Sequence, residues 1–215
     1  MSAIRRPAVP GDAPGMSRRL LRLFGTLAAL LLLGGCGAAP ELRYYRVECP
    51  APPRTAGPPL PVTLGIARLS APEPYQQERI LYRASPYRVQ SYGSERWETP
   101  PAEMVDALLL ERFTESGKFQ RVVSWRREAV DYRLQVRLRR FEEVDEGDTW
   151  YGVVEFAYEL VDGGGRGLLS ETAKERIRVE RKSVEGVVEA LSRGLEAGLD
   201  EAILRTAAAV AAARR

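Results

Sequence analysis

The chain has 215 residues, with 32 Lys plus Arg against 29 Asp plus Glu and no histidine. The absence of histidine excludes Ser-His-Asp and Cys-His catalysis, and it excludes zinc or iron sites that need an imidazole ligand. Five arginines and one aspartate precede Cys36, which leaves 27 basic against 28 acidic residues in the rest of the chain. The remainder is therefore close to neutral and has no basic footprint for nucleic acid.

An apolar stretch, residues 20–36 (LLRLFGTLAALLLLGGC), follows two arginines. An apolar run of about 7 to 15 residues behind a positive segment is typical of a secretory signal and is short for a membrane span. Its end, Leu33-Gly34-Gly35-Cys36, resembles the bacterial lipobox, whose cysteine takes a diacylglycerol and becomes the first residue. We therefore expect residues 1–35 to be a removed lipoprotein signal peptide and Cys36 to be the lipid attachment site. A plain secretory signal or an uncleaved anchor is the alternative, and Met16 is a second candidate start.

A proline-rich segment follows, with seven prolines among residues 37–61. Proline favours extended chain and blocks ladder hydrogen bonds, so we expect residues 36–61 to form a tether. Strand-forming side chains gather within it at residues 42–48, which predicts a possible edge strand. Cys49 is the one other cysteine, and we expect an inert free thiol there. Residues 62–215 are predicted to form a single domain.

Strand and helix patterns alternate through this domain. Apolar residues recur at helical spacing in two segments, which begin at Pro100 and Val184. Strand patterns occupy residues 62–69, 80–83, 87–92, 119–125, 132–138, 150–161 and 168–179. The alternation of polar and apolar residues reverses at Arg140-Phe141, which predicts a bulge or strand end at residues 139–141. The pattern predicts a two-layer α+β sandwich, in which a mostly antiparallel sheet of about six strands carries two helices on one face.

Four aromatic residues are candidates for partner contacts: Tyr82, Tyr87, Tyr92 and Trp97. The three tyrosines lie on two short neighbouring strands, where they could form an exposed surface. Cross-strand tyrosines also stabilise sheets without any partner, and that interpretation remains open.

An acidic run, FEEVDEGD, holds Glu142, Glu143, Asp145, Glu146 and Asp148. Without histidine, an enzyme would depend on carboxylates, and such a run could supply a catalytic pair or a calcium site. Its place at a predicted strand end favours a solvated acidic turn instead. We therefore expect no catalytic residue, no cofactor and no metal.

Several short elements together resemble the ABC-type transport auxiliary lipoproteins, a family that includes paraquat-inducible protein C. They are the lipobox, Tyr44-Tyr45-Arg46-Val47, residues 62–69 with Pro72 soon after, Ile80-Leu81-Tyr82-Arg83, Trp97 before the first helix, and Asp131-Tyr132-Arg133-Leu134. Each element is weak alone, and the likeness lies in their order and spacing. Cys49 and the long proline-rich segment are departures from the family pattern.

The resemblance implies a non-enzymatic lipoprotein of the Gram-negative outer membrane, facing the periplasm. Its implied partners are an MCE-domain protein, an ABC permease and an ATPase, which together move lipids or other hydrophobic compounds, and a homo-oligomeric ring is a further possibility. Gly37 stands where an Asp typically retains lipoproteins in the inner membrane, which favours the outer membrane. A regulatory or assembly lipoprotein for a cell-wall synthase or a secretion channel is the alternative, since the same tether and fold would serve it.

Overall fold

The computed structural model describes residues 41–52, 57–126 and 128–215. The predicted signal peptide and Cys36 lie outside these residues. The described part contains eight strands: β1 (Arg43–Tyr45), β2 (Leu60–Ala67), β3 (Arg79–Ser85), β4 (Arg88–Trp97), β5 (Phe119–Trp125), β6 (Tyr132–Glu146), β7 (Thr149–Asp162) and β8 (Gly167–Arg178). Its helices are the 3-10 helix η1 (Glu73–Gln76), α2 (Pro101–Glu115) and α3 (Val184–Ala213).

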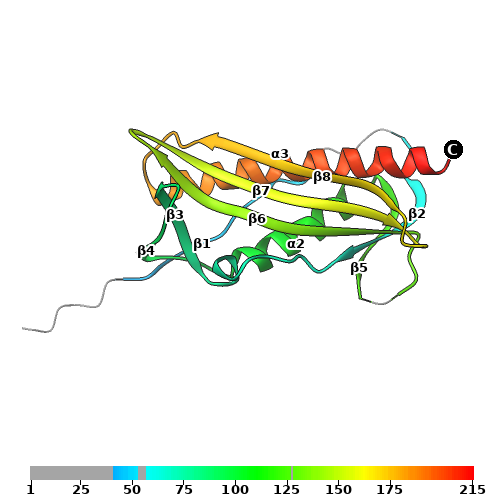
Figure 1. The fold of residues 1–215 in the computed structure, drawn as a ribbon, viewed down its shortest axis with the longest axis horizontal. Coiled ribbons are helices and arrows are strands. Elements are labelled where there is room, and N and C mark those ends of the chain that lie inside the picture. The colour runs from blue at the N-terminus through cyan, green and yellow to red at the C-terminus, as the bar shows by residue number, and fades with distance from the viewer. Residues whose placement is uncertain (1–40, 53–56, 127) are drawn as a thin grey trace, which may run out of the picture. The chain divides into compact units, whose positions relative to one another are not determined.

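The eight strands form one sheet in which β6 is the central member (Figure 1). The longest pairings, β6 with β7 and β7 with β8, are antiparallel. Along its other edge β6 pairs in parallel with β2 near its start and with β3 near its end. Beyond β3 lie β4 and then β1, and beyond β2 lies β5. The predicted α+β class with two helices is confirmed, whereas the predicted count of about six strands is too low by two.

A β-bulge interrupts β6 at the predicted position. Leu138 pairs with Phe156 of β7, but the next paired residue is Arg140, opposite Glu155, so Arg139 is extra. One extra residue restores the inward direction of the apolar side chains after the polarity of the sequence reverses. The bulge therefore allows Leu138 and Phe141 both to be buried on the same side of the sheet.

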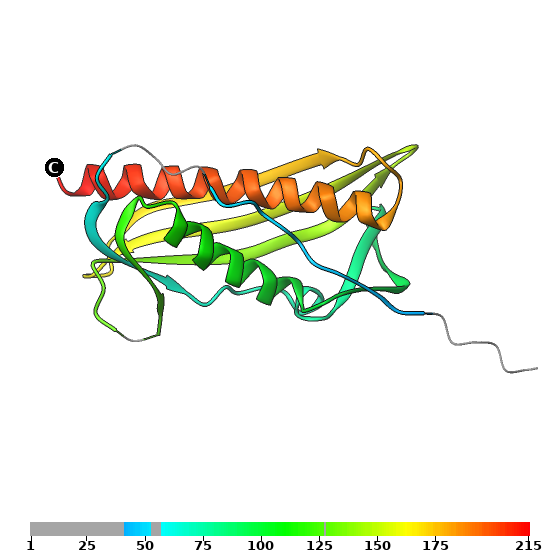
Figure 2. The same ribbon diagram turned by 180° about the vertical axis from the view of Figure 1, so that it is seen from behind.

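Both helices cover one face of the sheet (Figure 2). The core of the domain lies between them and the sheet and includes Leu134, Phe156, Leu160, Leu195 and Leu199. Small residues let α3 approach β7 closely. A Cβ atom at Gly198 would lie 3.0 Å from Phe156, and one at Gly152 would lie 2.9 Å from the Ala190 side chain. Because such distances are shorter than normal contacts, these two glycines set the spacing of helix and sheet.

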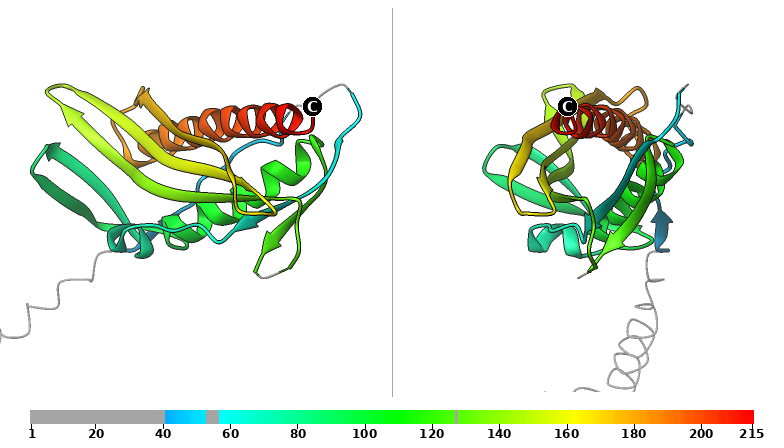
Figure 3. Two further views of the ribbon diagram at one scale, coloured as in Figure 1. Left: turned by 45° about the vertical axis from the view of Figure 1, so that its right-hand side comes forward. Right: turned by 90° about the vertical axis from the view of Figure 1, so that its right-hand side faces the viewer.

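Two hairpin turns lie at the same end of the sheet (Figure 3). The β3–β4 turn consists of Pro86 and Tyr87, with Ser85 paired to Arg88 on either side of it. The β6–β7 turn consists of Gly147 and Asp148. Parallel pairing of Arg83 with Val144 brings these two turns to the same level.

Candidate interaction surface

The four aromatic contact candidates have different surroundings. Tyr87 is 97% exposed at the β3–β4 turn, whereas Trp97 is 0% exposed and packs on Phe141 with ring centroids 5.5 Å apart. Tyr82 and Tyr92 are half-buried and pack on each other, with centroids 5.1 Å apart. Trp97 is thus a core residue with no surface for a partner, because it ends β4 where the strand meets the helix layer. Tyr87 is the candidate whose whole side chain is available for contact.

The hydroxyl of Tyr92 is also hydrogen-bonded to a buried carboxylate. Its hydroxyl donates a hydrogen bond to Glu143 Oε2 at 2.6 Å, and Glu143 is 1% exposed. Burial raises the pKa of Glu143 to about 8, with a further increase from the neighbouring Asp145. Glu143 is therefore largely protonated at neutral pH, and its side chain is part of the interior of the domain.

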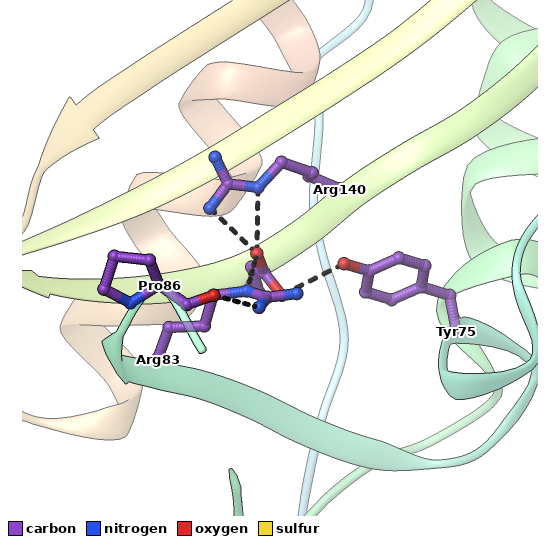
Figure 4. Close-up of polar contacts among 5 residues, drawn as sticks. Tyr75, Arg83, Pro86 and Arg140 are labelled. Atoms are coloured by element: carbon purple, nitrogen blue, oxygen red, sulfur yellow. Dashed lines mark hydrogen bonds and ion pairs between the residues drawn. The ribbon is translucent and has the colours of Figure 1, made fainter. Parts of the chain in front are cut away.

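Its neighbour Glu142 lies on the opposite face of β6, since successive strand residues alternate sides. Tyr75 donates to Oε2 at 3.0 Å, Arg83 Nε donates to Oε1 at 2.7 Å, and Arg140 Nε donates to Oε1 at 2.9 Å. Figure 4 shows the side chains of Tyr75, Arg83 and Arg140 converging on this carboxylate. The hydrogen bond to Glu142 raises the pKa of the Arg83 guanidinium, and burial raises the pKa of Tyr75 to about 12. The cluster links η1, β3 and β6 and leaves no oxygen free for chemistry.

These two carboxylates correct the predicted solvated acidic turn. β6 continues to Glu146 instead of ending near residue 138, so Glu142 and Glu143 are buried strand residues. They point to opposite faces and cannot act as a catalytic pair. Among the described residues no group of three or more His, Cys, Asp or Glu could hold a metal ion.

Replacing Glu142 with Gln is expected to lower the free energy of unfolding by about 1–3 kcal/mol, because the guanidinium groups of Arg83 and Arg140 lose their negatively charged acceptor in a buried site. Urea unfolding of the two proteins would measure the difference. Glu146→Gln is the matched control, since Glu146 is an exposed residue of the same strand with one ion pair to Arg176. Equal losses in the two variants would show that burial of Glu142 contributes nothing.

The segment that precedes β2 packs on the helices, although the sequence predicts a tether there. Within the range of the predicted edge strand, residues 42–48, the shorter strand β1 pairs in parallel with the outer edge of β4. Val47 is buried, the Glu48 amide donates to Ser192 Oγ at 3.2 Å, and Arg112 donates to the Pro50 carbonyl. Figure 2 shows this blue segment crossing the helix layer. Part of the predicted spacer is thus fixed to the domain.

Arg112 is the centre of this attachment. It is 1% exposed, and its Nη2 lies 2.5 Å from Asp200 Oδ1 and 3.9 Å from Glu196 Oε1, both on α3. The same guanidinium therefore joins α2, α3 and the segment at Pro50. Cys49 lies beside it, and burial raises the pKa of its thiol to about 11. A thiol with so high a pKa is mostly protonated and unreactive, as expected for an inert cysteine.

A cavity of 620 Å³ lies among β2, α2 and the loop after β2. Leu69, Leu110 and Ile66 supply apolar lining, and Arg68, Glu103 and Asp106 supply charged lining. Asp106 is already used, since its Oδ1 accepts a hydrogen bond from the Leu69 amide at 2.8 Å. The charges are mixed in sign and do not converge on one point, so this cavity defines no class of ligand.

None of the helices in the described residues is long and apolar enough to cross a membrane.

Comparisons with known proteins agree with the fold. A family model for the ABC-type transport auxiliary lipoprotein component matches residues 45–202, which is more than half of the chain. A crystal structure of a Xanthomonas campestris protein assigned to the family DUF330 is 24% identical, with a TM-score of 0.73, and the match covers 80% of this chain and 99% of that one. A second crystal structure, of an uncharacterized protein, is 13% identical, with a TM-score of 0.64 and coverage of 78% and 99%. No curated protein matches the sequence significantly.

Proposed function

Because the chain belongs to the family of ABC-type transport auxiliary lipoprotein components, we propose that it is a non-enzymatic docking protein for an ABC transporter, anchored through Cys36. The observation that carries this proposal is the family match over residues 45–202, which spans β2 to β8 and most of α3. The predicted lipobox supplies the anchor. The role requires contact with a partner and no chemistry of its own.

The membrane and the partner are the finer parts of the proposal. We place the protein on the periplasmic side of the outer membrane, because Gly37 follows Cys36 in place of an aspartate. The partner is an MCE-domain protein that works with an ABC permease and an ATPase on lipids or other hydrophobic compounds. This assignment is supported by the resemblance of the sequence to the auxiliary lipoproteins.

Side chains, more than strand addition, are expected to carry the partner contact. Among the described residues β8 pairs only with β7, so it forms an outer edge of the sheet, twelve residues long. It carries five charged side chains: Glu171, Lys174, Glu175, Arg176 and Arg178. Charged side chains on an edge strand oppose pairing with another chain. Several copies of the domain could surround one partner without joining their sheets.

Replacing Cys36 with Ser is expected to abolish membrane attachment, because acyl chains on one cysteine would be the whole anchor. The measurement is fractionation of cells that express the full chain, together with labelling by radioactive palmitate. Cys49→Ser is the matched control and should retain the label and the outer-membrane position. If Cys36→Ser stays in the membrane fraction, the anchor is elsewhere.

Crosslinking tests the partner separately. The lipidated full chain, crosslinked in cells and purified, is expected to recover an MCE-domain protein. Recovery of a cell-wall synthase or secretion-channel subunit in its place would overturn the transport assignment and support an assembly role. Recovery of no protein at all, with the anchor intact, would count against docking of either kind.

A further inference from the structure

The β3–β4 turn combines side chains that suit a lipid surface. Tyr87 is almost wholly exposed, Val89 is 43% exposed, and Arg88 between them is exposed. The segment 79–94 contains three arginines and no acidic residue. Tyrosine is enriched at the headgroup level of membranes, and arginine binds phosphate through charge-assisted hydrogen bonds.

A hydrogen bond connects the exposed turn to the side chain of Arg83. Arg83 Nη1 donates to the Pro86 carbonyl at 3.5 Å, while Nε of the same side chain is bound to Glu142 (Figure 4). The turn is thereby connected to a buried cluster on β6. Tyr87 therefore projects from a turn that is connected to β6 through Arg83 and Glu142, and its contacts with a surface would help to orient the domain.

Acidic residues of the neighbouring β6–β7 turn limit the electrostatic part of any lipid contact. Glu146 is paired with Arg176 at 2.5 Å, so its charge is compensated. Asp148 is exposed at the turn itself. The apolar and aromatic side chains of the β3–β4 turn must then provide most of the attraction.

The chain between Cys36 and β1 is short enough to keep this turn close to a membrane to which Cys36 is attached. β1 runs parallel to β4, with Arg43 opposite Glu95, so the chain enters β1 from the side of the β3–β4 turn. Arg43 is seven positions after Cys36 in the sequence, and these seven steps of chain span at most about 25 Å. Glu95 is eight positions after Tyr87, and eight steps of extended strand span about 26 Å. Pro50 is fixed by Arg112, so no extra length comes from the other side of β1.

We propose that the β3–β4 turn rests on the phospholipid bilayer to which Cys36 is attached, with Tyr87 and Val89 among the headgroups and Arg88 at a lipid phosphate. This inference rests on the proposed lipidation of Cys36. Even a fully extended chain from Arg43 back to Cys36 would reach no farther along the strand direction than the turn. The turn thus reaches the bilayer whenever the domain points its hairpins toward it.

The test places a fluorescent label at the turn. The lipidated full chain, with Cys49→Ser and Tyr87→Cys, is labelled with an environment-sensitive fluorophore and reconstituted into vesicles of phosphatidylethanolamine and phosphatidylglycerol. Leu204→Cys is the matched control, because Leu204 is 56% exposed on α3. A phospholipid that carries a quencher in its headgroup is expected to remove most of the fluorescence at position 87 and little at position 204. The emission at position 87 should also shift to shorter wavelength.

Three other outcomes overturn the inference in different ways. If the protein floats with the vesicles but the quencher lowers the fluorescence at position 87 no more than the small loss at position 204, the anchor exists and the turn does not touch the lipid. If position 87 is shielded only after a purified MCE-domain partner is added, the turn belongs to the protein interface. If the protein does not float at all, lipidation of Cys36 fails, and with it the premise of the inference.

Discussion

Replacing Arg112 with Met is expected to release residues 47–50 from the helices and to lower the free energy of unfolding by about 2–4 kcal/mol. Arg112 is buried, and Met removes its bonds to Asp200 and to the Pro50 carbonyl. The loss falls toward the lower end because the side chains of Asp200 and Glu196 are more than a third exposed and can regain water. Urea unfolding measures the change.

The thiol of Cys49 reports the release directly. In a Cys36→Ser background it is the single thiol, and its raised pKa of about 11 keeps it protonated. Release would return the pKa toward 9, which speeds alkylation at pH 8 on the order of a hundredfold. Arg205→Met, which removes an exposed pair with Glu201 on α3, is the control and should change neither quantity much. A segment that stays attached would leave the alkylation slow.

The native domain is expected to lose stability as the pH rises, and replacing Glu143 with Gln is expected to prevent this loss. The folded pKa of about 8 lies above the ordinary value of 4.5, so the folded state holds the proton more tightly. The stabilising effect is complete below about pH 4.5 and is lost as the pH rises through 8. One pKa unit corresponds to about 1.4 kcal/mol, so the change amounts to a few kcal/mol.

The comparison is between melting temperatures at pH 5 and pH 9. Gln keeps an acceptor for the Tyr92 hydroxyl and cannot ionise, so the variant should match the native protein at pH 5 and exceed it at pH 9. Glu146→Gln controls for the loss of an acidic residue at an exposed site of the same strand. Parallel melting curves for all three proteins would mean that Glu143 titrates normally.

Local pattern predicted the elements of this domain well. The alternation from Tyr132 to Leu138 predicted a strand, because each residue of a strand faces one side. Its reversal at Arg140 predicted a bulge or a strand end at residues 139–141, and the structure has a bulge there, with Arg139 as the extra residue. Apolar spacing predicted α2 and α3 on one face. Strand partners were not predictable, since the parallel pairings of β2 and β3 with β6 join residues 68 and 61 positions apart through contacts that no local pattern encodes.

The same dependence on strand partners that are distant in sequence explains why residues of the candidate surface were misjudged from the sequence. Glu142 and Glu143 look solvated in the sequence because their partners Arg83 and Tyr92 come from strands more than 50 residues earlier. Trp97 looks like a surface aromatic for a similar reason. The exposure of Tyr87 depends on its place in the two-residue turn between β3 and β4.

The parallel pairing of β1 with β4 also determines how the domain would bear mechanical load. A pull on the chain before β1 acts along the strand, so its three residues share the force in shear. If the edge strand were antiparallel, a pull from the same side of the sheet would instead act on the end of the strand that continues into the loop. After β1 in the chain, the hydrogen bond from Arg112 to the Pro50 carbonyl is a second attachment of this segment to the domain. A copy attached to a membrane would thus resist the force exerted by a moving partner without unfolding from its attached end.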